Sequence, residues 1–202
     1  AVGTIGSFVI IVLANQNSQT DQARIAQLTA EYQKETEAYQ AKVDAQAAEL
    51  SKLYFDKLNQ FANRPAVFDK ASVTELKTED LLVGDGDAIT SESSFTAYYI
   101  GWTPDGKIFD SSINGSALKA PFNVTPGGVI EGWTKGVDGM KVGGVRELAI
   151  PSDLAYGETG SGDSIPANSP IKFVVMIIPT PEAIAQPAMS PELMNYYQTG
   201  RL

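Results

Sequence analysis

The chain has 202 residues and a mass of 21.6 kDa, enough for one ordinary domain with additional segments and too few for a large multidomain assembly. Its formal charge of −9, from 24 acidic and 15 basic residues, disfavours a nucleic-acid-binding protein, because phosphate neutralisation needs clustered Lys and Arg. Cysteine and histidine are both absent, which excludes disulfides, thiolate nucleophiles, Cys/His metal sites and histidine-dependent catalytic dyads. Any chemistry must therefore rest on carboxylate, lysine, tyrosine or shape.

The first fourteen residues are uncharged and include an apolar run from Phe8 to Leu13. We interpret residues 1–14 as the remnant of a membrane anchor, although a full span needs about 20 residues. The alternatives are the core of a secretory signal peptide and an apolar segment buried in a partner. With the anchor interpretation, we expect a membrane-anchored protein whose remaining residues lie on the extracytoplasmic face.

A segment without Gly or Pro extends from Asp21 to about Phe61 and predicts one long helix. Its larger apolar residues recur at a spacing of 3, 4 and 4, an eleven-residue repeat that runs nearly parallel to a straight helix axis. We call this set the apolar stripe; it consists of Ile25, Leu28, Tyr32, Tyr39, Val43, Leu50, Tyr54, Leu58 and Phe61, and Thr36 and Ala47 occupy the two positions that complete the spacing. We predict a helical stalk over residues 15–63, whose stripe packs on a second copy of the helix, on a partner or on the folded domain.

The helix is expected to end at Asn63-Arg64-Pro65, because proline disfavours helical geometry in the residue before it, and residues 64–72 then form a linker. Glycine-punctuated sequence rich in strand formers follows as far as residue 180. Candidate strands occupy residues 73–76, 81–83, 95–101, 145–150 and 171–178. Residues 131–140 between them predict at best a short helix. The pattern indicates an α+β fold in which an antiparallel sheet closes over one short helix.

Four separated motifs in this region resemble, in order and spacing, those of the FKBP-type peptidyl-prolyl isomerases. They are GKIFDSS at 106–112, VIEGW at 129–133, IPSDLAYG at 150–157 and IPAN at 165–168. The resemblance covers about half of the chain, and we assign residues 73–180 to an FKBP-type isomerase domain. It implies a twisted antiparallel sheet wrapped around a short helix, here preceded by one long helix, and peptidyl-prolyl cis-trans isomerase activity.

This activity suits a chain without cysteine or histidine. An X-Pro bond isomerises over a barrier of about 18–20 kcal/mol without breaking a covalent bond. The twisted amide has lost much of its resonance dipole, so a dry aromatic pocket favours it over the planar form. No metal or organic cofactor is implied.

The resemblance also implies the roles of individual residues. Trp133 would form the pocket floor, while the Ile130 N–H and the Tyr156 hydroxyl would hold substrate carbonyls. The Asp110 carboxylate would orient polar groups at the pocket edge, including the hydroxyl of Tyr99. The implied catalytic set is Tyr99, Phe109, Asp110, Ile130, Trp133, Tyr156 and Phe173, and the implied substrate-binding set is Phe122, Val124, Val129 and Ile165.

The expected partners are proline-containing segments of unfolded or newly exported proteins and, by resemblance, macrolide-type immunophilin ligands. The polar, Gly-rich loop at 157–164 predicts either weaker selectivity for the residue before proline or reliance on another part of the chain for substrate capture. The alternative function is a catalytically weak binding module for proline-containing segments, or a chaperone, tethered to a membrane complex and self-associating through its helix.

The C-terminal tail, residues 181–202, contains prolines and several apolar side chains. Ser190-Pro191-Glu192 predicts the start of a short helix that ends near Tyr196 and Tyr197. The tail is interpreted either as a loose terminus or as a strap against the domain.

Overall fold

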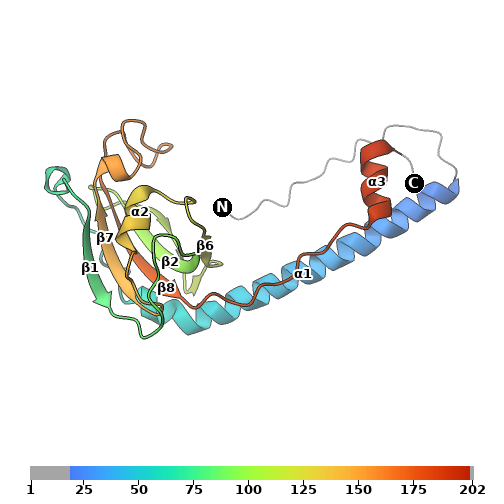
Figure 1. Ribbon diagram of the computed structural model, residues 1–202, viewed down its shortest axis with the longest axis horizontal. Helices are drawn as coiled ribbons and strands as arrows, with labels where there is room; N and C mark the ends of the chain where they lie inside the picture. The colour runs from blue at the N-terminus through green and yellow to red at the C-terminus, as the bar shows by residue number, and fades with distance from the viewer. Residues whose placement is uncertain (1–18, 201–202) are drawn as a thin grey trace. The chain divides into compact units, whose positions relative to one another are not determined.

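The computed structural model describes residues 19–200 (Figure 1). The chain forms two compact units, of which one comprises Asp44–Ala183 and the other comprises the chain up to Val43 together with the C-terminal segment from Ile184. The predicted anchor at residues 1–14 lies outside the described residues. Within 19–200, no helix combines the length and the apolar character needed to cross a membrane.

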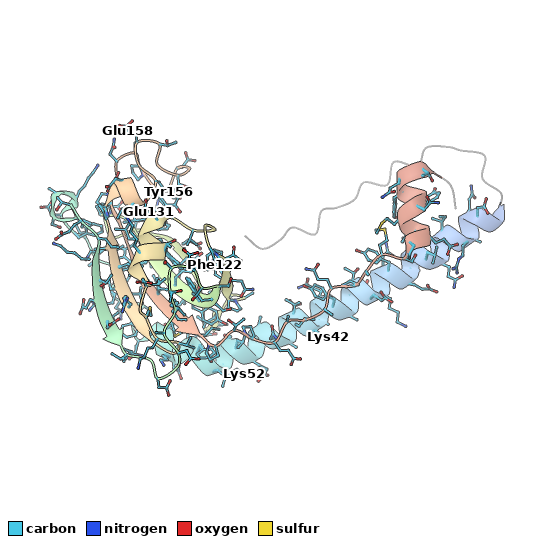
Figure 2. All side chains as sticks on the ribbon, viewed as in Figure 1. Lys42, Lys52, Phe122, Glu131, Tyr156 and Glu158 are labelled. Atoms are coloured by element: carbon cyan, nitrogen blue, oxygen red, sulfur yellow. The ribbon has the colours of Figure 1, made fainter. Side chains whose placement is uncertain are left out.

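The long helix α1 extends from Gln19 to Asn59. At its end, i→i−3 hydrogen bonds replace the helical ladder, with Phe61 N donating to Leu58 O at 2.9 Å, so the helix stops before the predicted Asn63. Charged residues such as Lys42 and Lys52 lie on its exposed side (Figure 2). Every residue of the apolar stripe is buried or half-buried, so the stripe is covered along its whole length.

Six strands form one antiparallel sheet, in the order β1-β7-β8-β2-β3, with β6 also pairing with β2. The strands are β1 Lys77–Leu82, β2 Phe95–Trp102, β3 Ile108–Ser111, β6 Phe122–Val124, β7 Val145–Ile150 and β8 Ile171–Ile178. A separate hairpin consists of β4 Ile113–Asn114 and β5 Ala117–Leu118. The helices besides α1 are α2 Glu131–Gly136, α3 Pro191–Thr199 and the 3-10 turns η1 Lys70–Ser72 and η2 Ser152–Leu154.

The predicted α+β class and its antiparallel sheet around a short helix are confirmed, and β2, β7 and β8 lie where strands are predicted. The predicted strand at 73–76 is wrong, because Val73 is buried without strand pairing and the edge strand begins only at Lys77. Side chains of β1 are exposed from Lys77 to Asp80, so the strand lacks the apolar alternation that would predict it.

The sheet has two faces because successive side chains of a strand point to opposite sides. On the face that we call the front, residues of β2, β7 and β8 pack against α2, with Trp133, Val137 and Met140 buried. On the opposite face, the back, the core is formed by Tyr98, Ile100, Trp102, Val174, Met176 and Ile178. Successive residues of β2 therefore pack into the cores on opposite faces of the sheet.

The end of α1 covers the back face. Leu58 is fully buried there, and Leu50, Tyr54 and Phe61 of the stripe pack around it. Two hydrogen bonds fasten the helix: Ser51 Oγ accepts from Leu118 N at 2.7 Å, and Lys57 Nζ donates to Gly143 O at 2.7 Å. The compact unit that contains the sheet accordingly begins at Asp44, within α1 and earlier than the predicted domain start at residue 73.

The predicted linker is also part of this unit. Arg64 bonds to Glu79 and Glu147, both at 2.8 Å, and thereby ties the chain after α1 to strands β1 and β7. Phe68 N donates to Pro104 O at 2.9 Å, and Lys172 Nζ lies 5.2 Å from the centre of the Phe68 ring. These contacts hold residues 64–68 against the sheet instead of leaving a free connection.

The predicted C-terminal helix is confirmed as α3. Ser190 Oγ caps it by accepting from Leu193 N at 3.2 Å, and Pro191 occupies its first turn. The helix ends at Thr199, with Gly200 in the left-handed conformation that a helix C-terminus favours. From Ile184 onwards the tail belongs to the same compact unit as the first part of α1.

Candidate active site

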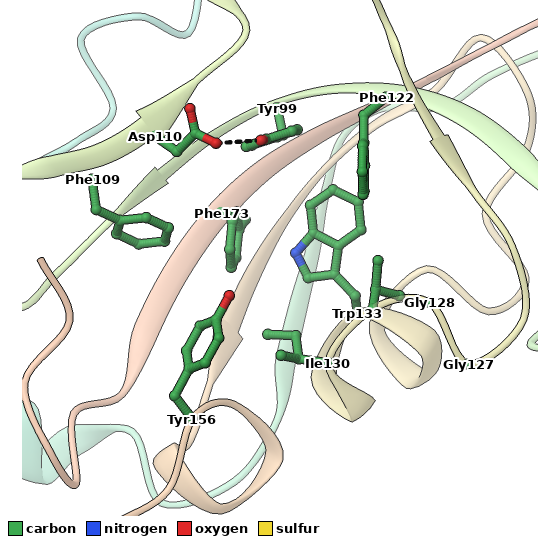
Figure 3. A pocket seen from close by; sticks show the side chains of 11 residues that line it. Tyr99, Phe109, Asp110, Phe122, Gly127, Gly128, Ile130, Trp133, Tyr156 and Phe173 are labelled. Atoms are coloured by element: carbon green, nitrogen blue, oxygen red, sulfur yellow. Dashed lines mark hydrogen bonds between the residues drawn. The ribbon is translucent and has the colours of Figure 1, made fainter. Parts of the chain in front are cut away.

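A cavity of about 450 Å³ opens on the front face of the sheet (Figure 3). Its walls come from β2, β3, β6, β8, α2, the loop before α2 and the segment after η2. It is lined by Tyr99, Phe109, Asp110, Phe122, Gly127, Gly128, Val129, Ile130, Trp133, Tyr156 and Phe173. The lining is mainly aromatic and aliphatic, and its polar side-chain groups are a carboxylate, two tyrosine hydroxyls and the indole N–H of Trp133, which is buried without a hydrogen-bond partner among the described residues.

The indole of Trp133 is presented by the short helix α2 and is only 3% exposed. The helix can approach β7 closely because residue 132 is glycine, at which a Cβ atom would lie 2.2 Å from Ile150 Cγ2. The glycine of the VIEGW motif thus sets the depth of the pocket floor.

Edge-to-face contacts orient the aromatic rings. The ring centroids of Trp133 and Phe173 are 5.3 Å apart with an interplanar angle of 89°, and those of Trp133 and Tyr99 are 5.5 Å apart at 84°. Phe109 and Phe173 meet at 5.4 Å and 88°. The rings fit beside β2 because residue 101 is glycine, where a Cβ would lie 2.6 Å from both Phe109 and Phe173. This geometry is the preferred one for aromatic pairs and holds the walls rigid.

The Asp110 carboxylate lies at the rim and accepts three hydrogen bonds. The Tyr99 hydroxyl donates to Oδ2 at 2.5 Å (Figure 3). Oδ1 accepts from Ser111 N at 2.8 Å and from Lys119 Nζ at 3.3 Å. Partial burial alone would raise the pKa of Asp110, but the hydrogen bonds from Tyr99 and Ser111 and the charge of Lys119 outweigh it and lower the pKa. Asp110 is therefore ionised at neutral pH.

The two tyrosine hydroxyls are neutral at neutral pH. Burial raises the pKa of Tyr99, and its hydrogen bond to Asp110 raises it further. Burial also raises the pKa of Tyr156, with a smaller contribution from the charge of Asp110. The Tyr156 hydroxyl points into the cavity (Figure 3), where it can donate to a bound carbonyl.

The backbone N–H of Ile130, at the entry to α2, donates to no group among the described residues. The Ile130 carbonyl, in contrast, accepts from Trp133 N at 3.0 Å and Thr134 N at 3.3 Å. Because first-turn N–H groups of a helix lack intrahelical partners, this donor is available to a ligand in the cavity.

Most of the predicted site residues meet in this one cavity. Those that line it are Tyr99, Phe109, Asp110, Phe122, Val129, Ile130, Trp133, Tyr156 and Phe173. Val124 and Ile165 are instead buried in the front core, 3% and 4% exposed, and are not part of the lining. Gly127 and Gly128 also line the cavity, although they were not predicted as site residues. The feature of the sequence that could have indicated them is Pro126-Gly127-Gly128, which is typical of a turn. Among residues 19–200, no group of three or more carboxylates could hold a metal ion.

Residues 86–178 match the sequence model of the family described as "FKBP-type peptidyl-prolyl cis-trans isomerase". Over 102 residues, the chain is 39% identical to the FK506-binding protein of Neisseria meningitidis serogroup A, and the alignment covers 50% of this chain and 91% of that protein. The chain belongs to the FKBP-type peptidyl-prolyl cis-trans isomerases. All the residues that line the cavity lie within the matched FKBP-type region, whereas α1, β1 and α3 lie outside it.

A second FKBP-type relative is FK506-binding protein 4 of Dictyostelium discoideum, with 46% identity over 105 residues. That alignment covers 51% of this chain and 28% of the Dictyostelium protein, so the chain spans less than a third of this larger relative. The crystal structure of FkpA from Escherichia coli has 29% sequence identity to this chain and a TM-score of 0.47. The structural alignment covers 82% of this chain and 74% of the FkpA chain.

Proposed function

We propose that this FKBP-type protein catalyses the cis-trans isomerisation of X-Pro bonds in extended or unfolded polypeptides. The observation that carries the proposal is the 450 Å³ aromatic cavity with an unpaired Ile130 N–H in its wall. Its volume falls within the usual range of about 300–1,000 Å³ for small-ligand sites, which suits a prolyl ring and its flanking amides.

The cavity favours rotation about the X-Pro bond because most of its wall offers no hydrogen bonds to a planar amide. A planar amide in water is stabilised by hydrogen bonds to its dipole, and phenyl rings such as those of Phe109 and Phe173 offer no equivalent hydrogen bond. The twisted amide has lost most of that dipole, so it is less penalised by the same walls. Ile130 N–H donates to one substrate carbonyl and thereby holds the chain on one side of the rotating bond.

The polar groups at the rim position the substrate and take part in no proton transfer. Asp110 stays ionised and holds the Tyr99 hydroxyl at 2.5 Å, while the raised pKa values of Tyr99 and Tyr156 keep both hydroxyls protonated. A loss of the Asp110 carboxylate therefore weakens orientation without removing a reacting group.

The test is catalysed isomerisation of a Leu-Pro tetrapeptide by the full chain, compared with two neighbouring variants on β3. Phe109→Ala removes a cavity wall and is expected to lower kcat/KM by about 100-fold, as misplacing a substrate by about 1 Å does. Ile108→Ala changes an exposed side chain outside the lining and should retain activity. A folded protein without turnover would favour the binding-module alternative, and turnover that is insensitive to Phe109→Ala would contradict the assignment of this cavity as the active site.

We also propose that the protein is attached to a membrane through residues 1–14 and acts on the extracytoplasmic side on newly exported polypeptides. The apolar run from Phe8 to Leu13 supports the attachment, and the 41 residues of α1, about 60 Å long, supply a spacer. Carbonate extraction of membranes should leave the full chain in the pellet and release a variant lacking residues 1–14. Quantitative release of the full chain would contradict the attachment.

A further inference from the structure

The N-terminal half of the apolar stripe is covered within its own compact unit. Leu28 is 6% exposed, and Ile25, Tyr32, Tyr39 and Val43 are half-buried. A helix alone would leave one face bare, and besides the helix the described part of this unit contains only residues 184–200. Among the described residues it is the C-terminal segment that lies beside this part of the helix: Figure 1 shows the chain before α3 running along α1 and the N-terminal end of α3 meeting the first part of α1.

A paired ionic contact fixes the position of α3. Arg24 Nε donates to Glu192 Oε1 at 3.1 Å, and Arg24 Nη2 donates to Glu192 Oε2 at 2.7 Å. This fork geometry specifies orientation as well as contact. Leu193, directly after Glu192, is 1% exposed, whereas the next residue, Met194, is 47% exposed. One side of α3 is thus an apolar docking face and the other is open.

The segment from Glu182 to Glu192 has the same length as the stretch of α1 that it runs beside. Gln46 Nε2 donates to Glu182 O at 2.8 Å, and Arg24 pairs with Glu192. At about 1.5 Å per residue, Arg24 and Gln46 are about 33 Å apart along the helix. At roughly 3.3 Å per residue, an extended chain from Glu182 to Glu192 spans the same distance.

The sequence favours that extended conformation. No helix or strand lies between the end of β8 at Ile178 and the start of α3 at Pro191, and Pro179, Pro181 and Pro187 occur in this interval. Proline lacks the backbone donor that a helix interior needs and pushes the preceding residue towards extended geometry. An eleven-residue repeat keeps the stripe nearly straight, so a single extended strand can follow it.

We propose that the C-terminal segment, residues 181–199, is the built-in partner of the apolar stripe and closes α1 against pairing with a second copy of the chain. The stripe and the tail meet within one molecule at high effective concentration, and a second helix could reach the same stripe only by displacing the tail. The tail thus sets the oligomeric state, independently of the isomerase pocket.

The test compares neighbouring substitutions in the full chain by sedimentation velocity in one detergent. Leu193→Asp places a charge on the buried docking face and is expected to strengthen self-association at least tenfold, because loss of a buried leucine weakens docking by about that factor or more. Met194→Asp places the same charge on the exposed side and should sediment as the unaltered monomer. A chain ending at Thr180 removes the whole segment and should self-associate most strongly.

The absence of native cysteine permits a direct readout of docking. In an Arg24→Cys, Glu192→Cys double variant, a short bis-maleimide is expected to crosslink within one chain, and adding Leu193→Asp should reduce this product. Self-association of the unaltered chain equal to that of the truncated one would overturn the proposal. So would a truncated chain that remains monomeric with its X-Pro turnover intact.

Discussion

On the back face of the sheet, Leu58 of α1 is fully buried, whereas on the front face Tyr99 and Phe109 remain half-buried beside an open cavity. Both faces use side chains of the same strands, and β2 alternates between them with Tyr98 to the back and Tyr99 to the front. The back is covered by a long helix with a continuous apolar stripe. The front is covered by a helix of six residues, which leaves the aromatic walls accessible. Incomplete coverage of one face is what creates the site.

Leu58→Ala should have the largest effect, and should affect stability alone. The substitution leaves a cavity under α1, and leucine-to-alanine changes in cores cost about 2–5 kcal/mol of unfolding free energy. Leu53→Ala on the same helix alters a side chain that is 71% exposed and should cost less than about 0.5 kcal/mol. Urea unfolding of both variants measures the difference, and equal values would mean that the back face does not depend on α1.

Gly101→Ala should reduce turnover at the front-face cavity with little effect on the packing of the back face. The new Cβ would lie 2.6 Å from Phe109 and Phe173, so both rings must move, and we expect about a 100-fold loss in kcat/KM. Its neighbour Ile100 faces the back, where Ile100→Val should cost about 0.5–1.5 kcal/mol of stability. Tetrapeptide turnover beside urea unfolding separates the effects, and a loss of turnover in Ile100→Val would show that the faces are coupled.

Removing one hydroxyl from either of the adjacent tyrosines should give opposite results. The Tyr98 hydroxyl is buried without a hydrogen-bond partner, so Tyr98→Phe should stabilise the fold by about 1 kcal/mol and leave turnover unchanged. The Tyr99 hydroxyl is bonded to Asp110, so Tyr99→Phe should reduce kcat/KM several-fold. Destabilisation by Tyr98→Phe would indicate that its hydroxyl has a partner after all.

The burial of Tyr98 also leads us to expect that folding stability depends on pH in the alkaline range. Burial raises the pKa of Tyr98 to about 12, above its value of about 10 in an unfolded chain. The unfolded state then loses this proton first, so the stability contributed by the neutral group is present below pH 10 and declines between about pH 10 and 12. Urea midpoints over this range should fall less steeply in Tyr98→Phe than in the unaltered chain, and parallel slopes would contradict the assignment.

The smallest effect is expected from Lys119→Met at the rim of the front face. Lys119 is one of the groups that lower the pKa of Asp110, so its removal should raise that pKa towards the usual range. Because both partners are about half exposed, the change in stability should be below about 1 kcal/mol. NMR titration of the Asp110 carboxyl measures this pKa, with Lys107→Met as the control. An unchanged pKa would show that Lys119 does not influence Asp110.

The pocket was the most predictable part of the molecule. Residues such as Phe109, Ile130 and Trp133 lie in short motifs whose order and spacing identify their places, and these residues do line one cavity. Val124 and Ile165 were less predictable, because an apolar residue next to a pocket can point towards the cavity or into the core. The first part of β1, residues 77–80, escaped prediction because its exposed polar side chains carry no apolar alternation, whereas Leu81 and Leu82 lie in the strand predicted at 81–83.

The sequence by itself determined the long helix, the antiparallel α+β fold and the aromatic residues of the pocket, since these follow from local periodicity and from motifs. It also determined that the apolar stripe must be buried. Only the tertiary structure decided what lies against it: the back of the sheet packs on Leu50, Tyr54, Leu58 and Phe61, and the C-terminal segment shares a compact unit with the residues from Ile25 to Val43. The physical reason is that hydrophobic burial is non-directional, so a stripe specifies the need for a cover but not which surface supplies it.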